Sequence, residues 1–465
     1  MSQLVDPLAS PGNRLLAHGL GGSTDLPIPY AYAVVGAVWA LTISFAVLAC
    51  AWRTTRLDAN RPGRRLPHAL TALIDAPATR GVLQMVALAF TVWVALAAFG
   101  GGDAQSNPLP GVFYVLVWVG IVPLSLLFGH VWSVISPVRI AHRLICRLTR
   151  RDPHTGWVTY PSWLGYWPAA LGLFAFVWVE LAWPDPGSVT TVRTWCVVYA
   201  VSMLAGSLVF GARWFERADP FDVYAALVAR LSPFSRRRQP TDESRGGQRG
   251  PVVVRNPLDN LDGLDVDRGL IAVVATLLGS TAFDSFSASE FWISRSQAWA
   301  GGSGSVATFL DTAAMLALIA FVSGTFWLAA RAAGGLPPAE HRALPGVLAH
   351  SLVPIVVGYV FAHYLTYLVE KGQSTIILLA DPLDRGWNLL GLGDEEVSFW
   401  LSGHPGLLAA LKVIFVLAGH VLGVITAHDR SVRVLPRGHQ LSGQLALLIA
   451  MVTYTFGGLY LLFSV

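Results

Sequence analysis

The chain has 465 residues, of which 54% are hydrophobic and only 13% are charged. Soluble globular proteins carry about 25% charged residues, so this composition excludes an ordinary soluble domain, whose surface needs more polar groups. The net charge of +4 reflects 32 basic and 28 acidic residues, and most of the basic ones stand between apolar segments. We therefore expect a lipid bilayer as the partner and no nucleic acid.

A polar, turn-rich segment, residues 1–28, precedes the first apolar run. Residues 16–32 have the sequence LAHGLGGSTDLPIPYAY. They lack the GxxxxGK[ST] spacing of a phosphate loop, and the segment lacks the basic and short apolar regions of a signal peptide. We interpret it as the extracytoplasmic entry into the first membrane helix, with Tyr30 and Tyr32 at headgroup height.

Ten apolar segments follow, each close to the roughly 20 residues that a helix needs to cross a bilayer. Open sheet edges are not stable in lipid, and the segments are too long and continuous for barrel strands. We therefore predict an all-α polytopic membrane helix bundle with about ten transmembrane helices. The segments are 29–52, 81–99, 111–131, 162–183, 193–212, 269–289, 306–330, 346–369, 405–427 and 441–464.

The placement of the arginines predicts the orientation of the bundle. Of the 32 basic residues, 26 fall in five alternate loops, and the positive-inside rule places those loops in the cytoplasm. Both termini would then be outside. The five loops are 53–80, 132–161, 213–268, 331–345 and 428–440.

The longest of these loops, 213–268, separates a first transmembrane half, 29–212, from a second half, 269–465. Its residues 219–234, DPFDVYAALVARLSPF, carry one apolar stripe at helical spacing. This stripe predicts an amphipathic helix that lies either in the membrane interface or packed beneath the bundle. Residues 235–251, SRRRQPTDESRGGQRGP, have no apolar periodicity, and they predict a flexible basic linker.

Four ionisable residues, Glu180, Asp284, Asp311 and His363, stand near the outer ends of apolar segments. Ionisable groups in lipid are costly, so each invites a functional hypothesis. Asp311 and His363 lie at similar depth, and we expect them first to form a proton pathway, because histidine titrates near physiological pH. Asp284 stands in GSTAFDSFSAS, which fits a broken membrane helix or a loop that leaves the membrane. Glu180 and Asp284 could instead reach headgroup water.

Four histidines, His130, His350, His420 and His428, stand near the cytoplasmic ends. Neutral imidazoles on facing helices can ligate haem iron or copper. Two of the four lie in GHVLGVITAHDR, whose GxxxG pattern permits close helix packing. The alternative is that each imidazole bonds a carbonyl or meets water, and we expect His428, which precedes charged residues, to be interfacial.

Four phrases, AHGLGGSTDLPIPYAY, FAHYLTYLVEKGQ, DPLDRGWNLLG and GHVLGVITAHDR, resemble those of uncharacterised polytopic membrane proteins from actinobacteria. The resemblance covers most of the chain. It implies an integral protein of the bacterial plasma membrane, and it carries no activity.

These observations favour a permease for a small solute or cation with proton coupling. The sequence contains no nucleotide motif, so an ion gradient or a partner would supply the energy, and we do not expect an enzyme. One alternative is a membrane redox or assembly protein that binds haem or copper through the inner histidines. Another is a non-transporting scaffold that presents its arginine surface to a membrane complex.

The orientation can be tested with reporter fusions. A reporter that is active only in the cytoplasm should be active when it is inserted in residues 213–268 and inactive at both termini, because most basic residues lie on one predicted side. An active reporter at the C-terminus would show that the number of spans is wrong.

Overall fold

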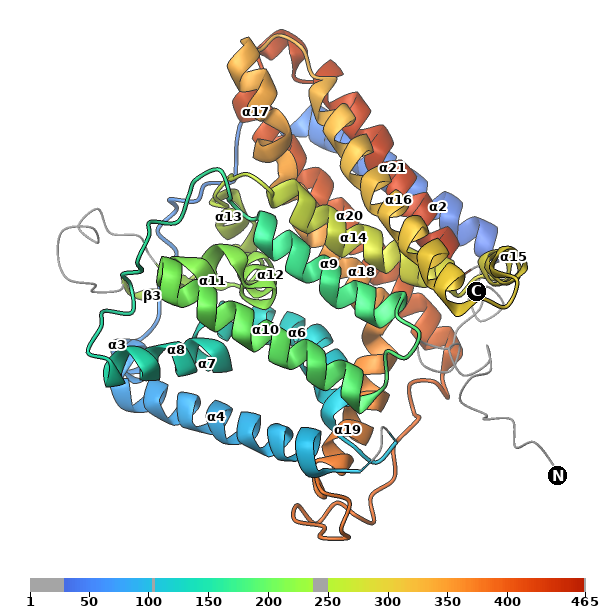
Figure 1. Cartoon of the computed structure of the whole chain (residues 1–465). Coiled ribbons are helices and arrows are strands. Elements are labelled where there is room, and N and C mark those ends of the chain that lie inside the picture. Colours follow the sequence, from blue (N-terminus) through green and yellow to red (C-terminus); the bar gives the residue numbers. More distant parts are fainter. Residues whose placement is uncertain (1–28, 103–104, 237–249, 464–465) are drawn as a thin grey trace.

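The computed structural model describes residues 29–102, 105–236 and 250–463, and it is a bundle of long helices (Figure 1). The all-α prediction is confirmed. Long apolar runs form helices because a helix satisfies its own backbone hydrogen bonds. The described residues contain nine stretches that are long and apolar enough to cross a membrane. They are α2 (Tyr30–Ala51), α4 (Pro77–Gly100), Leu109–Phe128, α10 (Val189–Phe210), α14 (Leu270–Ser287), α16 (Gly304–Arg331), Pro338–Leu378, α20 (Pro405–Val434) and Arg437–Phe463.

Three of the nine stretches are composite. The first contains α5 (Leu109–Gly111), a π-helical segment (Val112–Val119) and α6 (Ile121–Phe128). The second contains α17 (Pro338–Leu348), a 3-10 segment (Ala349–Leu352), α18 (Val353–Thr366), a π-helical segment (Tyr367–Lys371) and α19 (Gly372–Leu378). The third contains a 3-10 turn (Arg437–His439) and α21 (Ser442–Phe463).

The remaining predicted span, 162–183, contains a shorter helix. This helix, α9 (Trp167–Leu181), has 15 residues, because the chain before it turns at Gly165, where φ is +46°. It packs on α14 and buries Leu173 and Phe176 completely. The apolar segment 162–183 therefore forms a helix that is shorter than the nine long stretches and buries one side against α14.

Shorter elements lie at the two ends of the bundle. α17, α13 and α3 lie at one end, and α15 and α19 lie at the other (Figure 1). Most of the arginine-rich loops lie at the end that contains α17, α13 and α3. The shorter helices are α3 (His68–Asp75), α7 (Trp132–Ile135), α8 (Pro137–Leu148), α11 (Arg213–Ala218), α12 (Pro220–Ala229), α13 (Pro257–Asp262) and α15 (Glu290–Ala300).

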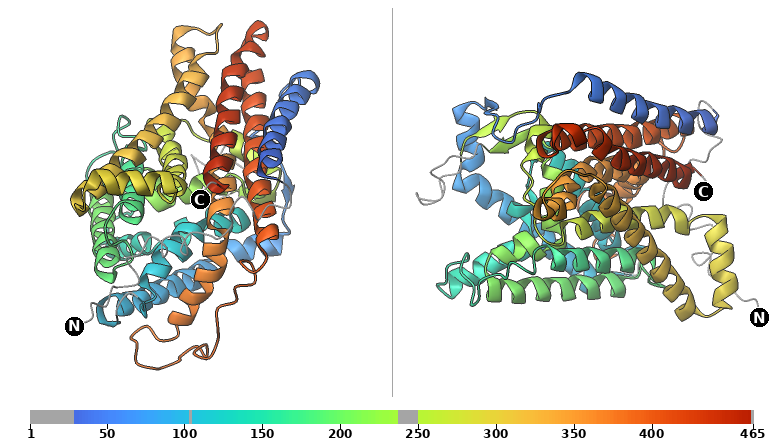
Figure 2. Two further views of the ribbon diagram at one scale, coloured as in Figure 1. Left: turned by 90° about the vertical axis from the view of Figure 1, so that its right-hand side faces the viewer. Right: turned by 90° about the horizontal axis from the view of Figure 1, so that it is seen from above.

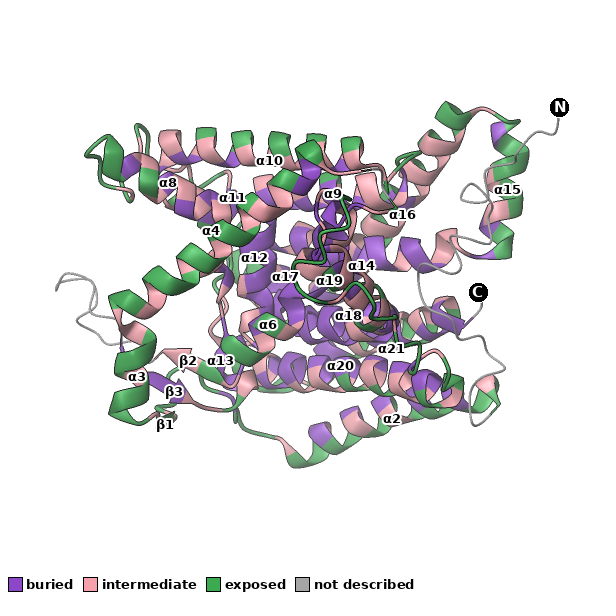
Figure 3. Cartoon of the chain, turned by 90° about the horizontal axis from the view of Figure 1, so that it is seen from below, coloured by how far each residue is buried: buried purple, intermediate pink, exposed green. Residues whose placement is uncertain are grey.

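Helix α12, which the sequence placed either in the membrane interface or beneath the bundle, is buried. Its Phe221, Tyr224 and Val228 are at most 3% exposed, and it packs on α6, α9 and α18. Figure 3 shows it among buried helices, whereas α4 presents a largely exposed surface. The exposed side chains of α4 include Met85, Val86 and Phe99, and they suit a lipid environment.

A small antiparallel sheet ties the arginine-rich end together. Its strands are β1 (Arg64–Arg65), β2 (Phe234–Arg236) and β3 (Val252–Val254), in the order β1-β3-β2. Val254 pairs with Arg64 on one side and with Phe234 on the other. The predicted basic linker, 235–251, therefore starts in β2 and ends directly before β3. Its residues 237–249 lie outside the described part of the chain, as does the entry segment 1–28.

Arg236 of this sheet binds a carboxylate. Its guanidinium donates two hydrogen bonds to Asp75, of 2.7 and 3.0 Å, and Arg80 donates a third at 2.7 Å. The hydrogen bond and charge of Arg236 hold the pKa of Asp75 below its usual value. The structure thus gives Arg236, at the start of the predicted linker, a protein partner.

The second half packs most extensively where α18 meets α20, and α2 lies alongside α20 and α21 at the edge of the bundle (Figure 2). Two glycines permit the close approach of α18 and α20. A Cβ atom on Gly419 would lie 2.7 Å from the carbonyl oxygen of Pro354 and 3.2 Å from the Cα of Gly358. The GxxxG pattern of α20 therefore faces α18, as small residues do at close helix contacts.

Replacing Gly419 with alanine should destabilise the protein by about 1–3 kcal/mol, because the added methyl group overpacks this contact. The measurement is thermal unfolding of the purified protein in detergent. Gly457→Ala on α21 is the matched control, since a Cβ atom there meets nothing within 4 Å. Equal melting temperatures for the two variants would contradict the assignment of this contact.

Candidate functional site

The candidate site is built around a buried carboxylate on α14. Asp284 is 4% exposed, and its Oδ2 atom lies 2.9 Å from Nε2 of His363. The hydroxyl of Tyr364 donates to the same oxygen at 2.8 Å. Both partners are adjacent residues of α18, so the contact of α14 with α18 forms the site.

Both ring nitrogens of His363 have polar neighbours. An ionised carboxylate only accepts, so Nε2 carries a proton when it bonds Asp284. On the other side, Nδ1 lies 3.3 Å from the hydroxyl of Ser285, which is 3.2 Å from the hydroxyl of Tyr359. A serine hydroxyl can donate or accept, so the imidazole can gain or lose a proton at Nδ1 and keep both contacts.

A second carboxylate lies near this group. Glu180 of α9 interacts electrostatically with Asp284 and with the hydroxyl groups of Tyr114, Tyr224 and Tyr367. Its Oε2 atom is buried and has no hydrogen-bond partner among the described residues. Asp284 is therefore enclosed by protein, whereas Glu180 is partly exposed and only its Oε2 atom is fully buried.

The predicted pair of Asp311 with His363 needs correction. Asp311 of α16 accepts a hydrogen bond of 2.8 Å from Nε1 of Trp292, while His363 bonds Asp284. The physical reason is α15, which folds back against α16 and brings Trp292 to Asp311. The structure therefore joins His363 to Asp284 and bonds Asp311 to Trp292.

The inner histidines form individual contacts. His420 and His350 are buried, and the Nδ1 of each bonds a carbonyl of its own chain segment, at Val416 and Val347. Such bonds to nearby carbonyls are the alternative that the sequence left open. Within the described ranges, no group of three or more His, Cys, Asp or Glu side chains is arranged to hold a metal ion.

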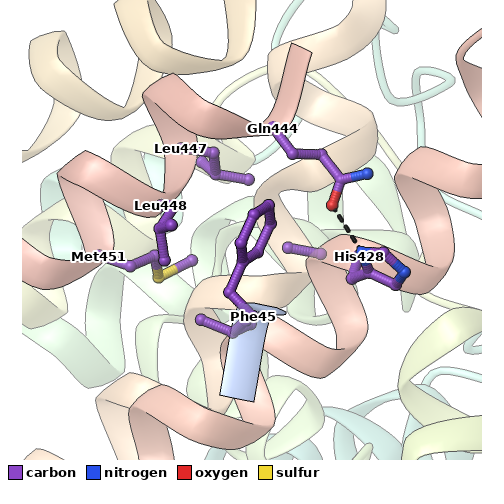
Figure 4. A pocket seen from close by; sticks show the side chains of 8 residues that line it. Phe45, His428, Gln444, Leu447, Leu448 and Met451 are labelled. Atoms are coloured by element: carbon purple, nitrogen blue, oxygen red, sulfur yellow. Dashed lines mark hydrogen bonds between the residues drawn. The ribbon is translucent and has the colours of Figure 1, made fainter. Parts of the chain in front are cut away.

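His428 differs from its predicted position, since it is 4% exposed rather than interfacial. Its Nδ1 lies 2.8 Å from Oε1 of Gln444 and its Nε2 lies 3.0 Å from the carbonyl oxygen of Trp52. Figure 4 shows the first contact beside a cavity of about 10 Å³ that Phe45 and Met451 help to line, which is room for about one water molecule. Both ring nitrogens of His428 therefore have hydrogen-bond partners within the protein.

His130 contacts a buried aspartate, Asp222, that the sequence did not indicate as part of a site. Its Nε2 lies 3.1 Å from Asp222, and Arg139 donates to the other oxygen of Asp222 at 2.6 Å. Asp219 caps α12 and accepts a bond of 3.0 Å from the hydroxyl of Tyr199. The two aspartates before the apolar stripe indicated only a helix start, so sequence could not show that Asp222 is buried.

Sequence reasoning also missed the tyrosines of the site. In YVFAHYLTY the polar residues Tyr359 and His363 are four apart, which places them on one face of a helix. This spacing was the available signal. No protein-family model matches the chain, and no curated protein or solved structure shows significant similarity to it.

His428→Leu should lower the free energy of unfolding by about 1–3 kcal/mol, because it leaves the Trp52 carbonyl and Gln444 without a partner in a buried place. The melting temperature in detergent measures the change, and His68→Leu, at an exposed position on α3, is the control. A variant as stable as the wild type would contradict this structural role, and His428 would again be a candidate ligand for haem or copper.

Proposed function

We propose that this multi-pass protein resides in a bacterial plasma membrane and moves a small solute or cation in exchange for, or together with, protons. Asp284 and His363 would be the proton-carrying pair. The observation that supports this proposal is the hydrogen bonding of one buried carboxylate by both His363 and Tyr364, at 2.9 and 2.8 Å. The resemblance to actinobacterial membrane proteins supports the cellular location.

The arrangement suits a change of protonation. A charge buried in lipid is unfavourable unless it is paired, and His363 supplies the pair when it is protonated. When the proton leaves, the imidazole and the hydroxyls of Tyr364 and Ser285 still offer hydrogen bonds.

Protonation at this place would act on helix packing. Asp284 belongs to α14, which also contacts α9 and α16, whereas His363 belongs to α18, which contacts α20. A change in the charge of the pair alters the attraction between α14 and α18. Such a change is the differential interaction that two conformations of a transporter require.

Asp284→Asn and His363→Gln should each leave the protein inserted in the membrane and abolish its proton movement. The assay places the purified protein in vesicles that contain a pH-sensitive dye, applies a pH gradient with candidate solutes, and records the rate of internal pH change. Each amide can still form a hydrogen bond, but neither can carry the exchanged proton.

Asp311→Asn is the matched control, because it removes a membrane carboxylate that bonds Trp292. We expect it to retain most of the rate. The proposal is rejected if proton movement continues in the Asp284→Asn, His363→Gln double variant, or if Asp311→Asn alone abolishes it.

A further inference from the structure

Helix α8 exposes two leucines between two long apolar helices. It packs on both α4 and α10 at the arginine-rich end of the bundle (Figure 1). One face of α8 is buried, with His142 and Cys146 at most 4% exposed. The other face carries Leu144 and Leu148, four residues apart and 51% and 77% exposed. Of the nine long stretches in the described residues, α4 and α10 have the smallest buried fractions, so the two leucines continue a surface that suits lipid.

The segment after α8 lies at the height where α10 ends. The backbone N of Val158 donates to the carbonyl oxygen of Val209 at 2.8 Å. The backbone N of Ala212 donates to the carbonyl oxygen of Pro153 at 3.0 Å. A segment that is bonded to the last turn of a membrane-spanning helix lies beside the lipid headgroups. Trp157, which is 66% exposed, suits this height, because tryptophan is enriched where membrane and water meet.

Three exposed arginines, Arg147, Arg150 and Arg151, follow the leucines. None of them forms an ion pair with another side chain in the described part of the chain. The guanidinium group of Arg151 lies 5.8 Å from the ring centroid of Trp157. Residues 147–158 contain one acidic residue, Asp152, whose side chain accepts a bond of 2.9 Å from a backbone N–H two residues later. The segment therefore presents a positive charge at headgroup height.

Arg150 occupies a backbone position that favours glycine. Its φ is +54°, and its backbone N donates to the carbonyl oxygen of Arg147 at 3.3 Å. The next backbone N, that of Arg151, donates to the carbonyl oxygen of Cys146 at 2.8 Å. These two bonds form a Schellman motif, whose left-handed residue is usually glycine. A residue with a Cβ atom is unfavourable there, and such strain points to a use for the guanidinium group.

We propose that Arg147, Arg150 and Arg151 bind the headgroups of anionic phospholipids in the leaflet that surrounds the end of α8. Guanidinium groups bind phosphate oxygens through paired hydrogen bonds, and the net positive charge of the segment favours lipids with a net negative charge. Leu144 and Leu148 lie beside the arginines, where they contact the acyl chains of the same lipids. The partner is therefore a lipid of the surrounding membrane, and its binding does not depend on transport.

The test is the melting temperature of the purified full-length protein in detergent, while phosphatidylglycerol or phosphatidylcholine with the same acyl chains is added. A ligand that binds only the folded state raises stability with its concentration. Phosphatidylglycerol should therefore give a saturable rise that exceeds the effect of phosphatidylcholine. Added salt should reduce this rise, because it screens exposed charges. Inorganic phosphate should give no comparable rise, since it has no acyl chains.

Arg150→Gly separates lipid binding from folding. Glycine adopts the left-handed conformation without a steric penalty, so this variant should be at least as stable as the wild type in detergent alone. Its apparent affinity for phosphatidylglycerol should nevertheless fall about fivefold, which corresponds to about 1 kcal/mol for one basic residue near an anionic surface. Arg147→Gln should show a similar loss of affinity. Arg385→Gln, which removes an exposed arginine between α19 and α20, is the control and should respond as the wild type does.

Three results would overturn the inference. One is equal stabilisation of the wild type by phosphatidylglycerol and phosphatidylcholine. Another is an unchanged affinity for phosphatidylglycerol in both Arg150→Gly and Arg147→Gln. The third is equal stabilisation by inorganic phosphate, which would indicate a site for a free anion. None of these measurements involves proton movement, so they can fail or succeed independently of the proposed function.

Discussion

A buried carboxylate on α14 needs hydrogen-bond donors close to it. This requirement determines how the central helices of the second half, residues 269–465, pack on each other. Asp284 is satisfied by two adjacent residues of α18, so α14 and α18 are held in one register. α18 in turn approaches α20 through Gly358 and Gly419. Lipid offers no competing hydrogen bonds, so the polar contact and the small residues together determine which helix faces meet.

Hydropathy predicted the long helices because crossing a bilayer needs about 20 apolar residues, whatever their neighbours are. The partner of each polar side chain depends on rotations and contacts between distant segments, which one sequence does not contain. Asp311 was predicted as the partner of His363 only because the two residues lie at similar depth in their apolar segments. The structure instead uses α15, a short outer helix within a predicted loop, to bring Trp292 to Asp311.

His428 shows the same limit at the opposite end of the bundle. Its charged neighbours Asp429 and Arg430 predicted an exposed helix end, but the residues after α2 fold over it. Trp52 Nε1 and Arg56 N donate to Asp429 at 2.7 and 2.6 Å, and Arg430 forms an ion pair of 2.9 Å with Asp262 of α13. Three segments separated by more than 100 residues thus bury charges that local sequence assigns to water.

The two carboxylates of the candidate site belong to different halves of the chain. Glu180 lies on α9 of the first half and Asp284 on α14 of the second, and these two helices pack on each other. Their mutual repulsion grows when both are charged and falls when a proton or a cation neutralises either one. The α9–α14 contact therefore links the charge of the site to the packing between the halves, whether or not the halves are related by an internal repeat.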